Sequence, residues 1–581
     1  MLSIAQNDMM NITRIVYPLL FLLLLAGCAP EVVRTPEFVF VTPDKEDTLE
    51  SLAQQHLGTP SMAWKIQESN DIDTITPGEE IIIPTKPIRP GGLTAEGYQV
   101  IPVLSYHNFT RGRSKNLLTV SSKNFNRQLS YLKKEKFHTL TLDQLEDFLN
   151  LGQVPRNSVI LTIDDGWISS YKVAYPILQE FGFNATLFIP SNYINGRSQK
   201  IINWAQAREM VNDNSIDIQC HTKGHRDLNL TESGESLQSY ITSIQDQVID
   251  SRKMIKNKIG KDVTSLAYPY GNTNPVVIEI LKNNGYKTAF TVKRDNNAFF
   301  THNFLLNRSM IYGKYNKNKF IKNINVFKEL SLDSPEPIDN FTDIRKISYM
   351  KASKYEEKEQ WRTALLAWKM QRDRLLTANS DWKSAFASHD DLLKKSDKKV
   401  AELNKKNKSI AQKHYLAAIE SRNKKIIRKQ LLRTLLYDPD HQDALAMLKN
   451  MPLKSQLSQY KVKPNETFET ISRKLYNKRS NGVLIPLFNR SIKDESDLVP
   501  GVNLVLPTAT AMNTIKPAEN IRCQVKLTKP PSQVAKDLYT EANVLFNQDK
   551  IGAAIDKLKK AICLNPNYDI AKEMLEMLSG L

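Results

Sequence analysis

"LTIDDGWISSY", residues 161–171, places two adjacent aspartates at the end of an apolar run and then turns the chain at a glycine. Adjacent carboxylates repel each other, so the pair costs stability unless the two groups have different roles. The simplest division of roles is a cation bound by one carboxylate while the other remains a free base. This interpretation predicts further metal ligands elsewhere in the chain.

Residues 95–330 alternate apolar, β-rich runs with helical stretches such as "FNRQLSYLKKEK". The runs are "QVIPVLSYH", "SVILTIDDG", "ATLFIP", "IDIQCHT", "SLAYPYG" and "KTAFTV". Strands that alternate with helices predict a parallel sheet or barrel whose reactive groups gather at the carboxyl ends of the strands. Asp164, His221 and Tyr270 each stand near the end of a different run, so we expect them to meet at one rim.

The segment "CHTKGHRDLN" contains the expected metal ligands, because His221 and His225 stand four positions apart. This spacing presents both imidazoles on one side if the segment turns helically. With Asp165 they form a two-histidine, one-carboxylate set that leaves positions open for water and substrate. Such ligands suit a divalent ion, zinc first, with cobalt or nickel as alternatives. Taken alone, the aspartate pair is more typical of a helix N-cap.

Three motifs occur in a fixed order: "TIDDGW", "HTKGH" and "YPYG", with "PILQEFGFNATLFI" after the first. In this order they resemble the polysaccharide deacetylases of the NodB-like family, carbohydrate esterase family 4. The resemblance covers about 230 residues of the chain. It implies an irregular (β/α) barrel and hydrolysis of N-acetyl groups on glucosamine-containing glycans.

The resemblance also implies a role for each motif residue. Asp164 matches the general base, and Asp165, His221 and His225 match the metal ligands. The backbone N–H of Tyr270 matches the donor that stabilises the oxyanion, together with the metal. A divalent ion there would make water acidic and would polarise the amide carbonyl.

The motifs leave alternatives for two groups, the general acid and the partner of the base. The opening "PVLSYHNF" resembles the subgroup that deacetylates poly-N-acetylglucosamine, in which the histidine of this strand is the acid. We therefore prefer His107 to His302, the alternative on the late part of the domain. The family's usual arginine before "PYG" is replaced by Ala267, and Arg308 is a candidate to orient Asp164 instead.

Two segments, residues 48–84 and 460–507, share a helix start of the type T-[LF]-E-[ST]-[LI] and a Pro-Gly turn into a short strand. An asparagine closes the second helix of each, Asn70 and Asn489. Both resemble LysM modules, which bind N-acetylglucosamine polymers, including peptidoglycan. We place these modules at residues 36–86 and 458–508. A structural unit that binds nothing is the alternative.

Two further regions have helical apolar spacing. Residues 340–455 include "LLRTLLYDPDHQDALAML", which resembles the end of a tetratricopeptide repeat. Residues 531–581 carry a clearer copy, with small, apolar and proline positions at Ala542, Leu545, Ala554, Leu558, Ala561 and Pro566. We expect these helices to be spacers or docking surfaces for protein partners.

The N-terminus predicts export. Residues 15–27, "IVYPLLFLLLLAG", are apolar and too short to span a bilayer comfortably. They lead into "LAGC", which resembles the lipobox of bacterial lipoproteins. Residues 1–28 therefore read as a lipoprotein signal peptide that ends at the lipidated Cys28, and Ala29 favours an outer-membrane lipoprotein facing the periplasm if the cell is Gram-negative. Cys523 and Cys563 could pair, but free thiols are favoured.

The formal net charge of +18 favours anionic surroundings, whereas export argues against nucleic acid as the partner. Together these features predict an α/β fold, an irregular (β/α) barrel flanked by small βααβ modules and helical repeats. The function that we expect is metal-dependent de-N-acetylation of an N-acetylglucosamine polysaccharide, either exopolysaccharide or peptidoglycan. The alternatives are an inactive glycan-binding scaffold and a polysaccharide de-O-acetylase.

Overall fold

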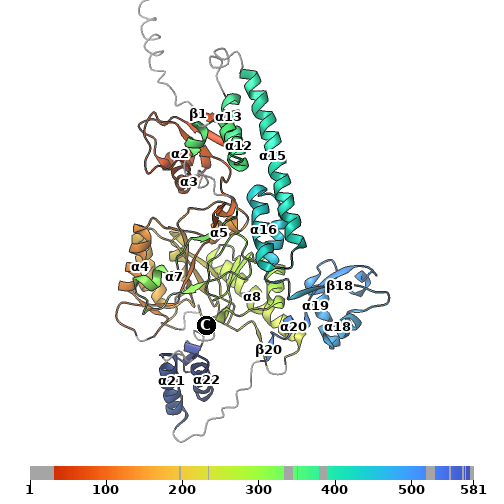
Figure 1. Ribbon diagram of the computed structural model, residues 1–581. Helices are drawn as coiled ribbons and strands as arrows, with labels where there is room; N and C mark the ends of the chain where they lie inside the picture. Colours follow the sequence, from red (N-terminus) through yellow and green to blue (C-terminus); the bar gives the residue numbers. More distant parts are fainter. Residues whose placement is uncertain are drawn as a thin grey trace, which may run out of the picture. The chain divides into compact units, whose positions relative to one another are not determined.

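The computed structural model describes residues 32–114, 116–194, 198–232, 235–332, 344–349, 351–377, 389–517, 530–547, 551–565, 568, 571–572 and 574–575 (Figure 1). The predicted lipidation site, Cys28, lies outside these residues. The chain divides into two compact units, residues 1–89 with 333–416 and 436–438, and residues 90–332 with 417–435 and 439–581. Each unit is described by itself below.

The second unit is built on a parallel sheet of short, buried strands. Its strands run in the order β15 (Thr288–Phe290), β14 (Ser265–Ala267), β12 (Ile216–Cys220), β11 (Ala185–Ile189), β10 (Ser158–Asp164), β6 (Val103–Tyr106) and β16 (Ser309–Met310). β9 (His138–Thr139) also pairs with β10. All seven residues of β10 are buried, which explains why its sequence is apolar throughout rather than alternating.

A single late segment joins the two edges of this sheet. Leu306 makes a parallel bridge to Phe290 of β15, and three residues later Ser309 pairs with Leu104 of β6. The sheet is therefore curled into an irregular barrel, as the sequence predicts. Arg308 lies inside the closing segment, which places it beside the central strands although it is far from them in sequence.

Helices cover the outside of the barrel (Figure 1): α4 (Ser122–Lys134), α5 (Leu142–Leu149), α6 (Tyr175–Phe181), α7 (Trp204–Asn212), α8 (Leu237–Ile259) and α9 (Pro275–Asn283). Their ends follow ordinary capping chemistry. The hydroxyl of Ser236 accepts a hydrogen bond from the backbone N–H of Ser239 at the start of α8, and Gly260 ends this helix at φ 82°. Apolar residues of all these helices except α5 share one continuous core with residues of the strands.

The second unit also contains the later helices and a small βααβ region. α16 (Lys424–Tyr437) and α17 (Gln442–Asn450) precede β18 (Leu457–Lys461), α18 (Phe468–Tyr476), α19 (Leu484–Phe488) and β19 (Asn503–Pro507). β18 and β19 pair antiparallel. α21 (Pro531–Asn547) and α22 (Ile551–Leu564) form a helical pair with Ala542, Ala554, Leu558 and Ala561 buried.

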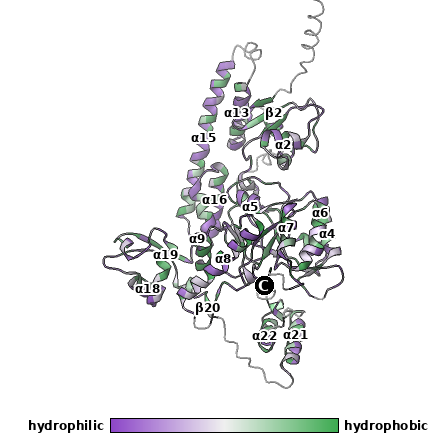
Figure 2. Ribbon diagram, turned by 180° about the vertical axis from the view of Figure 1, so that it is seen from behind, coloured by the Kyte–Doolittle hydropathy of each residue, from purple (hydrophilic) through white to green (hydrophobic). Residues whose placement is uncertain are grey.

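The first unit holds an antiparallel sheet of β1 (Val32–Arg34), β2 (Phe38–Val41) and β3 (Ile81–Pro84) with α2 (Leu49–Leu57) and α3 (Ala63–Asn70). Val39 and Val41 pack toward α2 and α3, whereas Phe38 and Phe40 pack with residues of α11 (Ile344–Tyr349), α12 (Ala352–Glu357) and α13 (Trp361–Thr377). Both faces of β2 are thus covered. Much of α15 (His389–Glu420) is hydrophilic (Figure 2).

The same asparagine contact recurs in both βααβ regions. The side chain of Asn70 donates to the carbonyl of Ile82 at 2.8 Å and accepts from its N–H at 3.0 Å. Asn489 makes the same pair with Val505, at 3.0 and 2.8 Å. In each region one amide side chain ties the end of the second helix to the last strand.

Two further observations concern membrane-spanning helices and the state of the cysteines. Among the described residues, no helix combines the length and the apolar character that a membrane span requires. Cys220 is a buried free thiol, whereas Cys563 is disulfide-bonded. The expectation of a free thiol at Cys563 is therefore wrong, because the spacing of lone cysteines in a sequence does not reveal their proximity in the fold.

Candidate active site

Two consecutive aspartates leave β10 in different directions. Asp164 is the last strand residue and is only 2% exposed. Asp165 adopts a left-handed backbone, with φ 76°, and its N–H donates to the carbonyl of Phe188 at 3.0 Å. Gly166 follows at φ 71°, where a Cβ would meet Ile194 at 3.0 Å. The turn therefore separates the two carboxylates that the sequence makes neighbours.

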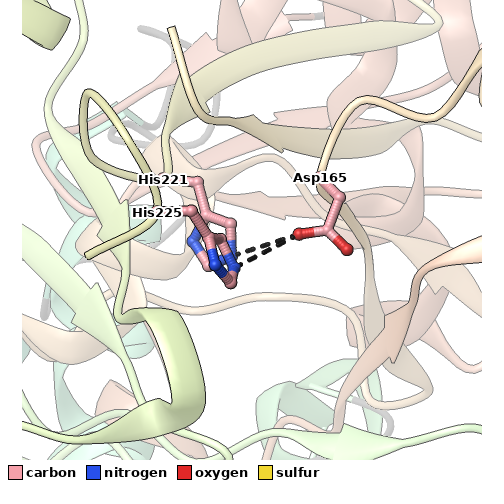
Figure 3. Close-up of side chains that lie close together, drawn as sticks. All are labelled: Asp165, His221 and His225. Carbon is pink, nitrogen blue, oxygen red and sulfur yellow. Dashed lines mark ion pairs between the residues drawn. The ribbon is translucent and has the colours of Figure 1, made fainter. Parts of the chain in front are cut away.

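Asp165 faces two histidines across the rim (Figure 3). One of its carboxylate oxygens lies 3.6 Å from Nε2 of His221 and 3.5 Å from Nε2 of His225. One ligand atom from each of the three residues lies within 4.8 Å of the others. This is the only such group of potential metal ligands in the described part of the chain.

The chemistry of the donors fits a divalent ion. Nδ1–H of His221 donates to the carbonyl of Ala267 at 2.7 Å, so Nε2 keeps its lone pair for a metal. Burial lowers the pKa of His221, which favours the neutral ligand form. The indole N–H of Trp167 donates to the second oxygen of Asp165 at 3.1 Å and orients this carboxylate. Two imidazoles and one oriented carboxylate suit zinc-like ions.

The loop between the histidines differs from the helical turn considered above. Residues 221–227 are outside any helix, and both Thr222 and His225 adopt positive φ, 68° and 57°. The carbonyl of Thr222 accepts hydrogen bonds from the Ser251 hydroxyl at 3.0 Å and from the Ser191 N–H at 3.1 Å. A tied, irregular loop thus brings both imidazoles to one side, with ring centres 4.8 Å apart.

Asp164 points instead to Arg308. An Nη1–H of this fully buried guanidinium donates to the Asp164 carboxylate at 2.8 Å, and its Nε–H donates to the carbonyl of Thr291 at 3.0 Å. Burial by itself raises the pKa of Asp164, but the charges of Arg308, His221 and His107 outweigh it and lower this pKa to about 2. Arg308 therefore contacts Asp164 and is placed to orient its carboxylate, as expected from the alanine at position 267.

The two candidate acids lie in different places. His107 directly follows β6, whose Tyr106 pairs with Ile163, so His107 stands beside Asp164 at the rim. His302 lies before the closing segment, next to the start of β15, since the carbonyl of the following Asn303 accepts from the N–H of Ala289. Burial lowers the pKa of His302 to about 4. The structure brings His107, and not His302, to the aspartate pair.

Tyr270 completes the rim. It follows β14 in a left-handed conformation at φ 60°, and its ring centre lies 5.1 Å from that of His225. Four rim residues, Asp165, Thr222, His225 and Tyr270, thus have positive φ without being glycine. Such backbone outliers cluster at functional sites.

Sequence reasoning missed two contributors to this rim. It assigned Trp167 no part in the metal site, and it noted Ala267 only for the arginine that is absent there. The structure shows that the Trp167 indole fixes Asp165 and that the Ala267 carbonyl fixes the tautomer of His221. Backbone carbonyls leave no mark on a sequence, whereas the tryptophan immediately after the turn was an available signal.

Comparison with known proteins matches two regions of the chain. Residues 152–289 match the Polysaccharide deacetylase family and residues 44–84 match the LysM domain. YxkH of Bacillus subtilis, named as a polysaccharide deacetylase, is 28% identical over 209 residues, covering 35% of this chain and 70% of that protein. The poly-beta-1,6-N-acetyl-D-glucosamine N-deacetylase of Staphylococcus aureus is 25% identical over 188 residues, covering 32% and 65%.

The match thus spans about two thirds of the length of these relatives. Among solved structures, the Streptococcus pyogenes deacetylase PplD in complex with acetate aligns with a TM-score of 0.36 and 24% identity, covering 39% of this chain and 98% of that one. The two family matches show that the chain contains a polysaccharide deacetylase domain and a LysM domain.

Proposed function

We propose that this chain removes acetyl groups from the nitrogen of N-acetylglucosamine units in an envelope polysaccharide. The observation that carries the proposal is the pairing of two differently held carboxylates at one rim. Asp164 is buried against Arg308, while Asp165 faces His221 and His225 at 3.6 and 3.5 Å. A base and a metal site stand side by side on consecutive residues.

The residues divide the reaction among them. Asp164 takes a proton from the attacking water, and its low pKa keeps it ionised for this role at neutral pH. Asp165, His221 and His225 would hold a divalent ion, which would supply Lewis-acid chemistry by polarising the acetyl carbonyl and making water more acidic. As the carbon–nitrogen bond breaks, the amine nitrogen gains a proton and acetate leaves.

Two further groups act on the substrate in this proposal. His107 stands beside Asp164 and donates the proton to the departing nitrogen; an imidazole suits this role near neutral pH. The backbone N–H of Tyr270 donates to the oxygen that becomes negative in the transition state. Arg308 is a positioning residue, because it holds Asp164 and does not reach the reacting atoms itself.

The substrate class follows from two kinds of domain in one chain. LysM modules bind N-acetylglucosamine polymers, and several relatives are named for deacetylation of poly-β-1,6-N-acetyl-D-glucosamine. Exopolysaccharide and peptidoglycan both present N-acetylglucosamine. We propose that the modules at 36–86 and 458–508 hold the enzyme on such a polymer.

Location is proposed from the N-terminus. We propose export, lipidation at Cys28 and retention at the outer membrane, facing the periplasm, in a Gram-negative cell. The short apolar segment before "LAGC" supports this proposal, and so does the disulfide at Cys563, since disulfides persist mainly in exported proteins. The helical pair α21–α22 is proposed as a docking surface for protein partners.

Acetate release tests the proposed activity. The full chain is incubated with chitooligosaccharides, poly-N-acetylglucosamine and purified peptidoglycan, with added Zn²⁺, Co²⁺ or Ni²⁺ or with a chelator. We expect metal-dependent acetate release that Asp164→Asn abolishes and that Asp246→Asn, on the exposed face of α8, leaves unchanged. Release only from O-acetylated glycan would assign a de-O-acetylase, and no release from any substrate would leave a glycan-binding scaffold.

A further inference from the structure

A large cavity begins at the catalytic rim and extends beyond it. Its volume is about 1050 Å³, at the upper end of the range for small-molecule sites. Tyr270, Gly271 and Asn272 line one part, and the helical residues Lys424 and Arg428 of α16 line another. The ring of Tyr270 also contacts that of His225, so this one residue borders both the cavity and the proposed metal site.

The lining of this cavity is strongly basic. Five cationic side chains contribute to it, against the single carboxylate of Asp295: Lys293, Arg294, Lys328, Lys424 and Arg428. All five are exposed. Apart from Arg294, none of these cations forms an ion pair or side-chain hydrogen bond with any residue that the structure describes. Their charge is therefore available to a ligand.

Arg294 differs because the protein holds it in place. Its guanidinium donates to the Tyr315 hydroxyl at 2.8 Å, to Asn323 at 3.2 Å and to the carbonyl of Met310 at 3.3 Å. These acceptors are neutral, so the positive charge itself remains uncompensated. A fixed, uncompensated cation within a cavity is a preorganised contact for an anion.

Aromatic rings lie among the cations. Tyr98 and Phe300 meet edge to face with their centres 5.2 Å apart, and Tyr312 and Tyr270 also line the cavity. Aromatic faces give apolar contact area at low entropic cost, and tyrosine hydroxyls can hydrogen-bond. Cations mixed with aromatic rings suit a polymer that has both ring faces and negative groups.

We infer that this cavity, which we name the basic groove, binds a carboxylate-bearing stretch of the same glycan chain whose acetyl group lies at the rim. The inference rests on the proposed function and narrows its substrate class to acidic N-acetylated glycans. Peptidoglycan strands without their stem peptides are such a polymer, because the lactyl carboxylates of their N-acetylmuramic acid units are then free and not bound in amide linkages. A neutral N-acetylglucosamine homopolymer is not.

The charge of the product affects which stretches of glycan the basic groove can bind. Each deacetylated unit carries an ammonium group, which the lysines and arginines of the basic groove repel. Stretches that are already deacetylated are therefore disfavoured there. Deacetylation should stop at a partial extent on long acidic strands.

Binding and activity are measured with matched ligands. The ligands are peptide-free peptidoglycan strands, the same strands with their carboxylates converted to amides, and chitohexaose. Lys424→Glu/Arg428→Glu reverses two charges of the basic groove on α16. Lys425→Glu/Lys429→Glu is the matched control, because it reverses two charges with the same spacing on the same helix but outside the groove lining.

We expect the groove variant to bind acidic strands at least about tenfold more weakly than the wild type at low salt, with the difference shrinking at high salt. It should keep wild-type acetate release from chitohexaose, which separates this inference from the proposed activity. The control should bind as the wild type does, and amidated strands should bind all variants alike. Equal binding by the groove variant, or equal loss in the control, would overturn the inference.

A second variant addresses the barrel side of the groove. Lys328→Glu changes an exposed residue of β17 (Phe327–Glu329), far in sequence from α16. It should weaken binding of acidic strands in the same direction, and circular dichroism checks that it is folded. Unchanged binding in both groove variants would assign the acidic-strand contact to another surface.

Discussion

Replacing Arg308 by methionine tests the pairing on which the proposed base depends. Arg308 is 0% exposed, Asp164 is 2% exposed, and their atoms meet at 2.8 Å. Removal of one partner of such a pair leaves an uncompensated buried charge, at a cost of about 3–5 kcal/mol. Asp164→Asn should also destabilise the barrel, because it leaves the guanidinium without its anion.

The double variant gives the sharper result. With both charges gone, no uncompensated ion remains in the barrel. The double variant should therefore lose less unfolding free energy than the two single variants together, by about 1–3 kcal/mol. Lys282→Met is the control: Lys282 pairs with Glu279 at 3.4 Å on the surface, and such pairs contribute only about 0–1 kcal/mol.

Hydrogen exchange of the β10 amides, measured with a chelator present, reports the opening free energy of this part of the barrel. Additive costs in the double variant, or an Arg308→Met variant as stable as Lys282→Met, would refute the reasoning.

The pH dependence has a definite sign. Because the pKa of Asp164 falls from its ordinary 3.8 to about 2, its contribution of about 2 kcal/mol is complete above pH 3.8 and is lost as the pH falls toward 2.

Three further predictions address other parts of the chain. His221→Ala should weaken Zn²⁺ binding by about 100-fold or more and abolish acetate release, as measured by calorimetry and by acetate assay. His107→Gln should slow acetate release about 10²–10⁴-fold, whereas His302→Gln should leave it near the wild-type rate; the opposite order would reassign the acid. Asn70→Ala should destabilise its βααβ region by about 1–3 kcal/mol, since it leaves two buried backbone groups of β3 without partners, and faster exchange of the β3 amides would show this.

Periodicity and motif order were sufficient to predict the barrel. Alternating strands and helices imply parallel pairing, and parallel pairing places every strand's carboxyl end at one rim. Asp164, His107 and Tyr270 therefore converge although many residues separate them. Arg308 was harder to place, because its position depends on the closing segment that pairs with both edges of the sheet. No local pattern encodes such a long-range closure.

The histidine loop shows where spacing alone misleads. A four-residue interval suggested a helical turn, yet His225 has φ 57° and the loop is held by its contacts with Ser191 and Ser251. Tertiary hydrogen bonds override the local preference for a helix here. The two imidazoles do lie together, as the spacing predicts. The cause, however, is the irregular loop and not a helical turn.

The adjacent aspartates are tolerated because the fold gives them opposite electrostatic partners. Asp164 ends a strand and turns inward to a buried guanidinium, whereas the left-handed backbone at Asp165 turns the next carboxylate outward to two imidazoles. With ordinary strand geometry, the side chain at position 165 would point to the face of the sheet opposite to that of Asp164. It would then not reach the rim. The strained turn is thus what converts a repulsive pair in the sequence into the proposed base beside the proposed metal site. Its energetic cost is offset by the hydrogen bond from the Asp165 N–H to Phe188 and by the absence of a side chain at Gly166.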